Sequence, residues 1–184
     1  MHDPRENAWK GLAAGLAAGL AATYVMTRFQ ELSGKLEKKL KQEDESHHPQ
    51  HSAKRGKEES AEGKEQGEDA TVKAATRLSR TLFHHELSRR EKKTAGPAMH
   101  YGFGILTGGA YGALAEVTPA VTRGMGTPFG TALWLGADEV AVPAFHLAGP
   151  PWKTPASVHA RALAAHLVYG LTTEGVRRLV RRAF

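Results

Sequence analysis

Glycine recurs at every fourth residue in an uncharged stretch near the start of the chain, "GLAAGLAAGLAATYVM", residues 11–26. Gly11, Gly15 and Gly19 fall on one side of a helix, because residues four apart share a face. In water, an interior glycine destabilises a helix by roughly 0.5–1 kcal/mol relative to alanine. In lipid, small residues at this spacing let two helix backbones approach closely. The pattern therefore predicts a membrane helix that packs through its backbone. A soluble alanine-rich helix is the alternative, and so is a signal peptide, which the missing A-x-A cleavage site disfavours.

Four apolar segments share this character, and each has the length of a bilayer-crossing helix, about 20 residues. The first covers residues 9–29, and the second covers residues 98–117 with its own glycine stripe, Gly104, Gly108 and Gly112. The third runs over residues 127–148, and the fourth follows Thr154 and Pro155. Thr127 and Thr154, each followed by a proline, are expected as helix caps. A soluble helical bundle would need charged outer faces, yet residues 102–115 and 124–137 contain no charge. We therefore predict an all-α integral membrane bundle of four transmembrane helices.

A polar insert separates the first two apolar segments. Residues 28–93 hold sixteen of the 25 Lys and Arg residues and thirteen of the 19 Asp and Glu residues. We expect an amphipathic extension of the first helix, a His-containing disordered stretch over residues 43–70 and a surface helix over residues 71–86. Ser88 and Glu91 form a capping box that starts the next helix, and Gly96 and Pro97 bend it into the second segment. The division is 1–29 as the first transmembrane helix, 30–95 as the insert and 96–184 as a three-helix membrane region.

Acidic and imidazole side chains interrupt the apolar helices. Asp138 and Glu139 lie near the middle of the third segment, where an unpaired charge costs roughly 2.5–3.5 kcal/mol. Counting from the shared turn between the last two segments, Asp138 lies about 15 Å deep and His166 about 16 Å. His159, His166 and Glu174 keep to one arc of the fourth helix. The candidate intramembrane polar cluster is His100, Asp138, Glu139, His159, His166 and Glu174.

Three interpretations of this cluster stay open. Imidazoles and carboxylates at low dielectric exchange protons near neutral pH, which indicates a proton relay or pH sensor. A metal site or a metal-dependent membrane enzyme is the second interpretation, although no local motif such as H-E-x-x-H occurs. The third is structural: the carboxylates bond to His side chains and Arg161 and hold the bundle in register. Pro143 lacks an N–H and leaves the carbonyl of Glu139 without its helical partner, so a local break is expected beside the acids.

The order of four blocks resembles a known family. The blocks are "GLAAGLAATYVM", "AGPAMHYGFGILTGGAYGAL", "GTALWLGADEVAVPAFHL" and "HARALAAHLVYGLTTEGVRR". Together they resemble the YagU-like family of small bacterial inner-membrane proteins, a domain of unknown function (number 1440). The resemblance covers the apolar segments and not the insert. It implies a multi-pass protein of the bacterial inner membrane with a link to acid tolerance in one branch, and it supplies no reaction or cofactor.

The leading hypothesis is a non-enzymatic membrane bundle whose polar cluster senses or passes protons or small ions. The alternative is a membrane-anchored scaffold that recruits a partner or anionic lipid through the charged insert. The expected partner is the lipid bilayer, with a second copy of the chain or another membrane protein as further candidates. No nucleic acid, cofactor or metal is expected. The chain has no cysteine, which excludes disulfides and thiolate ligands.

Overall fold

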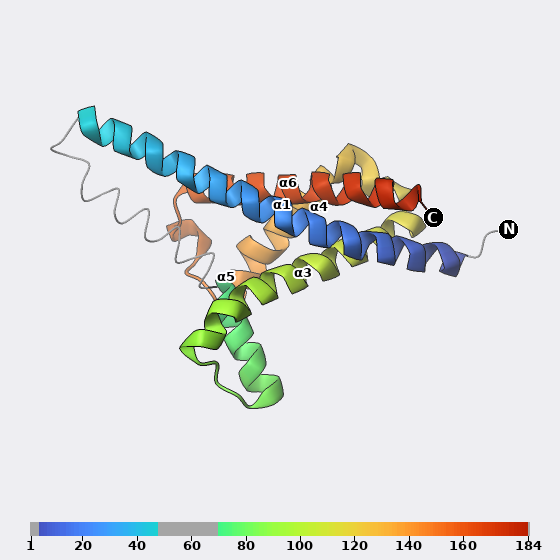
Figure 1. The fold of residues 1–184 in the computed structure, drawn as a ribbon, viewed down its shortest axis with the longest axis horizontal. Helices are drawn as coiled ribbons and strands as arrows, with labels where there is room; N and C mark the ends of the chain where they lie inside the picture. The colour runs from blue at the N-terminus through green and yellow to red at the C-terminus, as the bar shows by residue number, and fades with distance from the viewer. Residues whose placement is uncertain (1–3, 48–69, 184) are drawn as a thin grey trace.

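The computed structural model describes residues 4–47 and 70–183, and every regular element in these ranges is a helix, so the fold is all-α as predicted (Figure 1). A helix over residues 70–83 stands between α1 and α3. The other elements are α1 (Pro4–His47), α3 (Arg89–Val117), η1 (Pro119–Gly126), α4 (Thr127–Trp134), η2 (Leu135–Ala141), α5 (Val142–Ala144), η3 (Pro151–Lys153) and α6 (Ala156–Arg181).

The first apolar segment and its amphipathic extension form one uninterrupted helix, α1. The helix continues to His47, which is five residues into the stretch that the sequence analysis assigned to disorder from residue 43. The remainder of that stretch, residues 48–69, lies outside the described residues. The expected surface helix is present over residues 70–83, three residues shorter at its end than predicted.

Helix caps follow the sequence signals at one position and depart from them at two. Ser88 and Glu91 make the predicted capping box at the start of α3, and α3 then runs through Pro97 to Val117 as a single helix. The cap of α4 is Gly126, with φ of 82°, rather than Thr127. The cap of α6 is Pro155, which makes no side-chain cap hydrogen bond, rather than the predicted Thr154. In both cases the chain enters the helix through a backbone conformation that glycine or proline provides directly.

The two glycine stripes meet each other. A Cβ atom added at Gly112 would lie 2.2 Å from the carbonyl oxygen of Gly11, and one added at Gly108 would lie 2.5 Å from the Cα of Gly19. Real Cβ atoms do not approach other atoms so closely, so only glycine permits this helix spacing. Because Gly11 faces Gly112 and Gly19 faces Gly104, α1 and α3 run antiparallel with their backbones in contact, the close packing that small residues at this spacing allow.

Helix α6 packs against both α1 and α4. Ala22 and Met26 of α1 form a buried cluster with Ala165 and Tyr169 of α6. A second close glycine contact joins the other pair: a Cβ at Gly170 would lie 2.2 Å from the carbonyl oxygen of Gly126. The apolar segments therefore alternate in direction, and the start of α1 and the end of α6 lie at the same end of the molecule (Figure 1).

Of the helices in the described part of the chain, one is both long and apolar enough to cross a membrane, the part of α1 from Asn7 to Leu40. The core helix of a soluble protein or a signal sequence has the same properties. The other three predicted spans do not meet this criterion. The third is divided among short elements and carries Asp138 and Glu139. One spanning helix is therefore supported by length and composition, and a four-span bundle is not.

Candidate functional site

The third apolar segment changes helix type where its acids lie. It begins as α4, widens into the π-helix η2 with Asp138 and Glu139, and ends at Ala144, four residues before the predicted end. The N–H of Val142 donates to the carbonyl of Ala137, five residues earlier. Pro143 follows directly and has no N–H to donate. The predicted break beside the acids therefore takes the form of a π-helical turn, a feature frequent at functional sites.

Asp138 faces His166 across the interface between η2 and α6. Its Oδ2 lies 3.6 Å from Nδ1 of His166, and the Asp138 side chain is 38% exposed whereas that of His166 is 9% exposed. Nδ1 of His166 lies 2.9 Å from the carbonyl oxygen of Ala162, to which it can donate. The carboxylate thus lies at ion-pair distance but beyond direct hydrogen-bond distance. The equal depths counted from the sequence agree with this proximity.

Glu139 makes the closer contact of the two acids. Its Oε1 lies 2.5 Å from Nδ1 of His159 at the start of α6. The other ring nitrogen of His159 lies 3.0 Å from the carbonyl oxygen of Pro151. Both ring nitrogens therefore face acceptors, and only the protonated imidazole can donate to both.

His100 of α3 completes this region. It lies on α3, whose Gly104 and Thr107 contact Tyr169 of α6. Nε2 of His100 is buried, and so is Nε1 of Trp134, and neither bonds to any group in the described part of the chain. Buried polar atoms normally have partners. We call His100, Asp138, Glu139, His159 and His166 the imidazole–carboxylate site.

Glu174, the sixth residue of the predicted cluster, lies elsewhere. It is fully buried two helical turns beyond His166 on α6, where it accepts hydrogen bonds from the Tyr111 hydroxyl at 3.0 Å, from Arg177 Nε at 2.8 Å and from Arg178 Nε at 2.5 Å. Eight residues along α6 correspond to a rise of about 12 Å, so Glu174 lies too far along the helix to join His166. Its partners Arg177 and Arg178 follow three and four residues later on the same helix. The prediction of one cluster of six residues is corrected accordingly.

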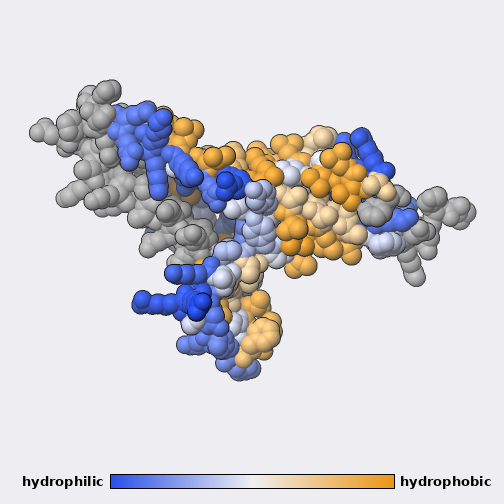
Figure 2. Space-filling model, viewed as in Figure 1, coloured by the Kyte–Doolittle hydropathy of each residue, from blue (hydrophilic) through white to orange (hydrophobic). Residues whose placement is uncertain are grey.

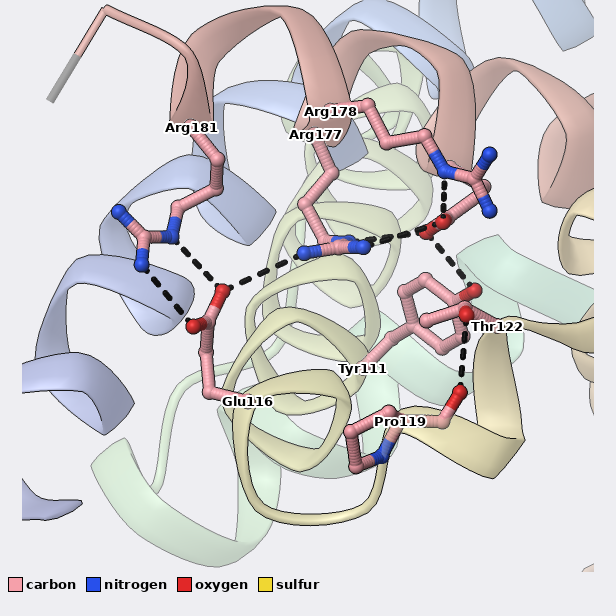
Figure 3. Close-up of polar contacts among 8 residues, drawn as sticks. Tyr111, Glu116, Pro119, Thr122, Arg177, Arg178 and Arg181 are labelled. Carbon is pink, nitrogen blue, oxygen red and sulfur yellow. Dashed lines mark hydrogen bonds and ion pairs between the residues drawn. The ribbon is translucent and has the colours of Figure 1, made fainter.

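A second carboxylate extends the contacts of Glu174 into a network at that end of the molecule. Glu116 of α3 accepts from Arg181 Nε at 2.7 Å and from Arg177 Nη1 at 3.3 Å. Figure 3 shows Arg177 and Arg181 reaching from α6 toward Glu116 at the end of α3, whereas Arg178 bonds within α6. We call Tyr111, Glu116, Glu174, Arg177, Arg178 and Arg181 the arginine–glutamate network.

Two further residues depart from their expected roles. Arg161 was expected as a partner for the acids of the third segment, but it pairs with Glu37 of α1. Tyr111 was not singled out, although its position beside Gly112 on the close face of α3 was a usable signal. Its ring stacks on Phe129 with centroids 4.4 Å apart. Both contacts join different helices, α6 to α1 and α3 to α4, so patterns within a single helix do not encode them.

Metal binding finds no support in the described residues. No group of three or more His, Asp or Glu side chains in that part of the chain is arranged to hold a metal ion. The two pairs of the imidazole–carboxylate site each supply one nitrogen and one carboxylate. This arrangement suits proton exchange rather than a complete coordination sphere.

A family model described as "Protein of unknown function (DUF1440)" matches residues 75–175, which is 101 of the 184 residues. The chain belongs to the DUF1440 family. The match begins inside the helix over residues 70–83 and contains the whole imidazole–carboxylate site, whereas α1 and its glycine stripe lie outside it. The match confirms the predicted resemblance to family 1440 over the second and third apolar segments and most of the fourth. No curated protein and no solved structure matches the chain.

Proposed function

We propose that this DUF1440 protein is a four-span membrane bundle that takes up and releases protons at its imidazole–carboxylate site. The single observation that carries the proposal is the geometry of this site. Two imidazole–carboxylate pairs join the π-helical turn η2 to α6, and on α3 a buried ring nitrogen of His100 has no hydrogen-bond partner among the described residues. Carboxylates and imidazoles held together exchange protons between pH 5 and 8.

The surface of the helices supports a bilayer location. Large apolar side chains are exposed along all four segments, among them Leu20 on α1, Leu106 on α3, Leu135 on η2 and Leu171 on α6. Figure 2 shows an apolar region between polar ends. An exposed apolar surface around a whole bundle is costly in water and favourable in lipid. Trp9 and Trp152 are exposed at opposite ends of the apolar segments, where membrane interfaces concentrate tryptophan.

The chemistry follows from the two kinds of pairing. A proton that reaches Asp138 or His166 changes the charge of a pair whose members are 3.6 Å apart. The groups that face this pair are His100 from α3 and Glu139 and His159 beside it. Loss of the Asp138 charge weakens the attraction between η2 and α6, while the Glu139–His159 pair still holds the two segments together. Uptake or release of a proton at the site therefore changes the contact between η2 and α6.

A proteoliposome assay tests the proposal. Full-length protein is reconstituted with an internal pH-sensitive dye, and the collapse of an imposed pH gradient is recorded. The wild-type chain should accelerate the collapse relative to empty liposomes, and Asp138→Asn and His166→Gln should each remove most of the acceleration. Glu31→Gln, which changes an exposed carboxylate that pairs with Arg28, is the matched control. Equal rates for wild type and Asp138→Asn would overturn proton passage at this site.

The scaffold alternative makes the opposite expectation. If the insert is the functional part, deletion of residues 43–69 abolishes the protein's function in cells and Asp138→Asn leaves it intact. If the imidazole–carboxylate site is the functional part, the results are reversed. A bacterial inner-membrane location and a role in acid tolerance belong to the leading proposal, and survival of a deletion strain after acid shock, complemented by these two variants, tests both.

A further inference from the structure

A small helical hairpin projects from one end of the bundle (Figure 1). It consists of the helix over residues 70–83 and the first turns of α3. A Cβ added at Gly96 would lie 2.8 Å from Cγ2 of Val72, so the two helices are in close contact. Arg77 donates a hydrogen bond to the carbonyl of Phe145, just beyond α5. The hairpin is thereby attached to the end of the bundle where α5 ends and where the exposed Trp152 lies.

Cations from both helices line one groove of this hairpin. The groove is bounded by Val72, Lys73, Thr76, Arg77, Arg80 and Lys92. No carboxylate in the described part of the chain lies within ion-pair distance of Arg77, Arg80 or Lys92, and the only bond that Arg77 makes there is to the carbonyl of Phe145. Positive charges that converge without a carboxylate repel one another unless an anion lies between them.

The opposite side of the same helix is apolar and exposed. Leu78, Leu82 and Phe83 are 48%, 61% and 75% exposed. Figure 2 shows hydrophilic and hydrophobic residues on opposite sides of this projection. A helix with one basic and one apolar side lies in the interface of an anionic membrane. A free phosphate ion would use the groove alone and would leave the apolar side without a role.

We infer that the groove between residues 72–80 and Lys92 binds the phosphate of an anionic phospholipid head group, while Leu78, Leu82 and Phe83 enter the interfacial layer beside it. This inference rests on the membrane location proposed above but not on proton exchange. Basic pockets at the ends of spanning helices bind anionic head groups by the same chemistry. The site is assigned to lipid because the charged groove and the apolar side belong to one rigid hairpin at the end of the bundle.

Binding is measured on the full-length protein in neutral detergent, with phosphatidylglycerol, phosphatidylcholine or inorganic phosphate added and bound lipid counted by native mass spectrometry. Phosphatidylglycerol should bind, phosphatidylcholine should not, and millimolar inorganic phosphate should not displace the lipid. The double variant R80Q/K92Q should lower the affinity for phosphatidylglycerol roughly 30-fold, since each interfacial cation contributes roughly a fivefold gain.

K38Q/K39Q, which removes two cations from α1, is the matched control and should bind phosphatidylglycerol as wild type does. Equal loss in both double variants, or no loss in R80Q/K92Q, overturns the lipid site. Binding of inorganic phosphate in place of lipid overturns the lipid assignment as well. His166→Gln should retain full lipid binding, so failure of this inference and failure of the proton proposal are told apart.

Discussion

The two polar regions of this protein differ in how completely their charges are paired. In the arginine–glutamate network, two carboxylates receive bonds from three arginines and a tyrosine, and Glu174 is fully buried. In the imidazole–carboxylate site, Asp138 lies 3.6 Å from its partner and His100 has a buried nitrogen without one. Saturated charge suits a structural role, and incomplete pairing suits exchange.

Backbone packing does not follow the same division. An added Cβ at Gly11 would lie 2.3 Å from Glu116 of the arginine–glutamate network, and one at Gly130 would lie 2.2 Å from the carbonyl oxygen of His166 in the imidazole–carboxylate site. At Gly175, next to Glu174, and at Gly136, near Asp138, an added Cβ meets nothing within 4 Å. The comparison teaches that the two regions differ in how their charges are paired and not in how closely their backbones pack.

The largest expected effect comes from the arginine–glutamate network. Glu174→Gln removes the buried charge and leaves Arg177 without its principal counter-ion. Breaking a buried pair by removing one partner costs about 3 kcal/mol or more. The free energy of unfolding in mixed micelles, followed by circular dichroism during denaturant titration, should fall by that amount. An unchanged free energy of unfolding would show that the buried charge of Glu174 does not stabilise the fold.

Next in size is the helix contact made by the glycine stripes. Gly112→Ala would place a Cβ 2.2 Å from the Gly11 carbonyl oxygen, so the helices must separate, at a cost of about 1–3 kcal/mol. Gly34→Ala on the same α1 is the matched control, because its Cβ meets nothing and alanine favours the helix by up to about 1 kcal/mol. The same unfolding assay should show loss in the first variant and none in the second.

Asp138→Asn should change stability much less than Glu174→Gln does. The Asp138–His166 pair is long and its carboxylate is partly exposed, so its loss should cost less than about 1 kcal/mol. The larger change is expected in the proteoliposome assay, where Asp138→Asn should remove most of the acceleration that the wild-type chain gives. If Asp138→Asn destabilised the protein as much as Glu174→Gln, the two regions would not differ in kind.

The smallest effect concerns a carboxylate outside both regions and provides a reference. Hydrogen bonds from the Ser88 side chain and backbone lower the pKa of Glu91 from 4.5 to about 2. The folded state therefore favours the ionised form, so this capping contribution is complete above pH 4.5 and is lost as the pH falls toward 2. Carbon-13 titration of the Glu91 carboxyl should show the low midpoint. Glu91→Gln should remove this titration and keep the helix start, since glutamine also completes a capping box.

Some of this arrangement was accessible from the sequence because it depends on local periodicity. Glycine spacing predicted close backbone packing, although not which helix α1 would meet, Ser88 and Glu91 predicted the start of α3, and residue counting placed Asp138 level with His166. The pairing of Glu174 with Arg177 and Arg178, three and four residues further on, also follows from spacing within one helix. The remainder depends on helix rotation and length. Tyr111 reaches Glu174 from α3, and Arg161 pairs with Glu37 because α1 continues well past its apolar part. No pattern within one helix encodes these two contacts.

The π-helical turn η2 has a mechanical consequence for the third segment. A π-turn accommodates one residue more than an α-turn, and each residue of register corresponds to a rotation of about 100° and a rise of about 1.5 Å. If η2 tightened to α-helical geometry, everything beyond it would swing by that angle. Glu139 would then turn away from His159. The π-helical turn therefore sets the register at which Glu139 faces His159, and a change of charge at Asp138 or Glu139 acts at the turn that sets it.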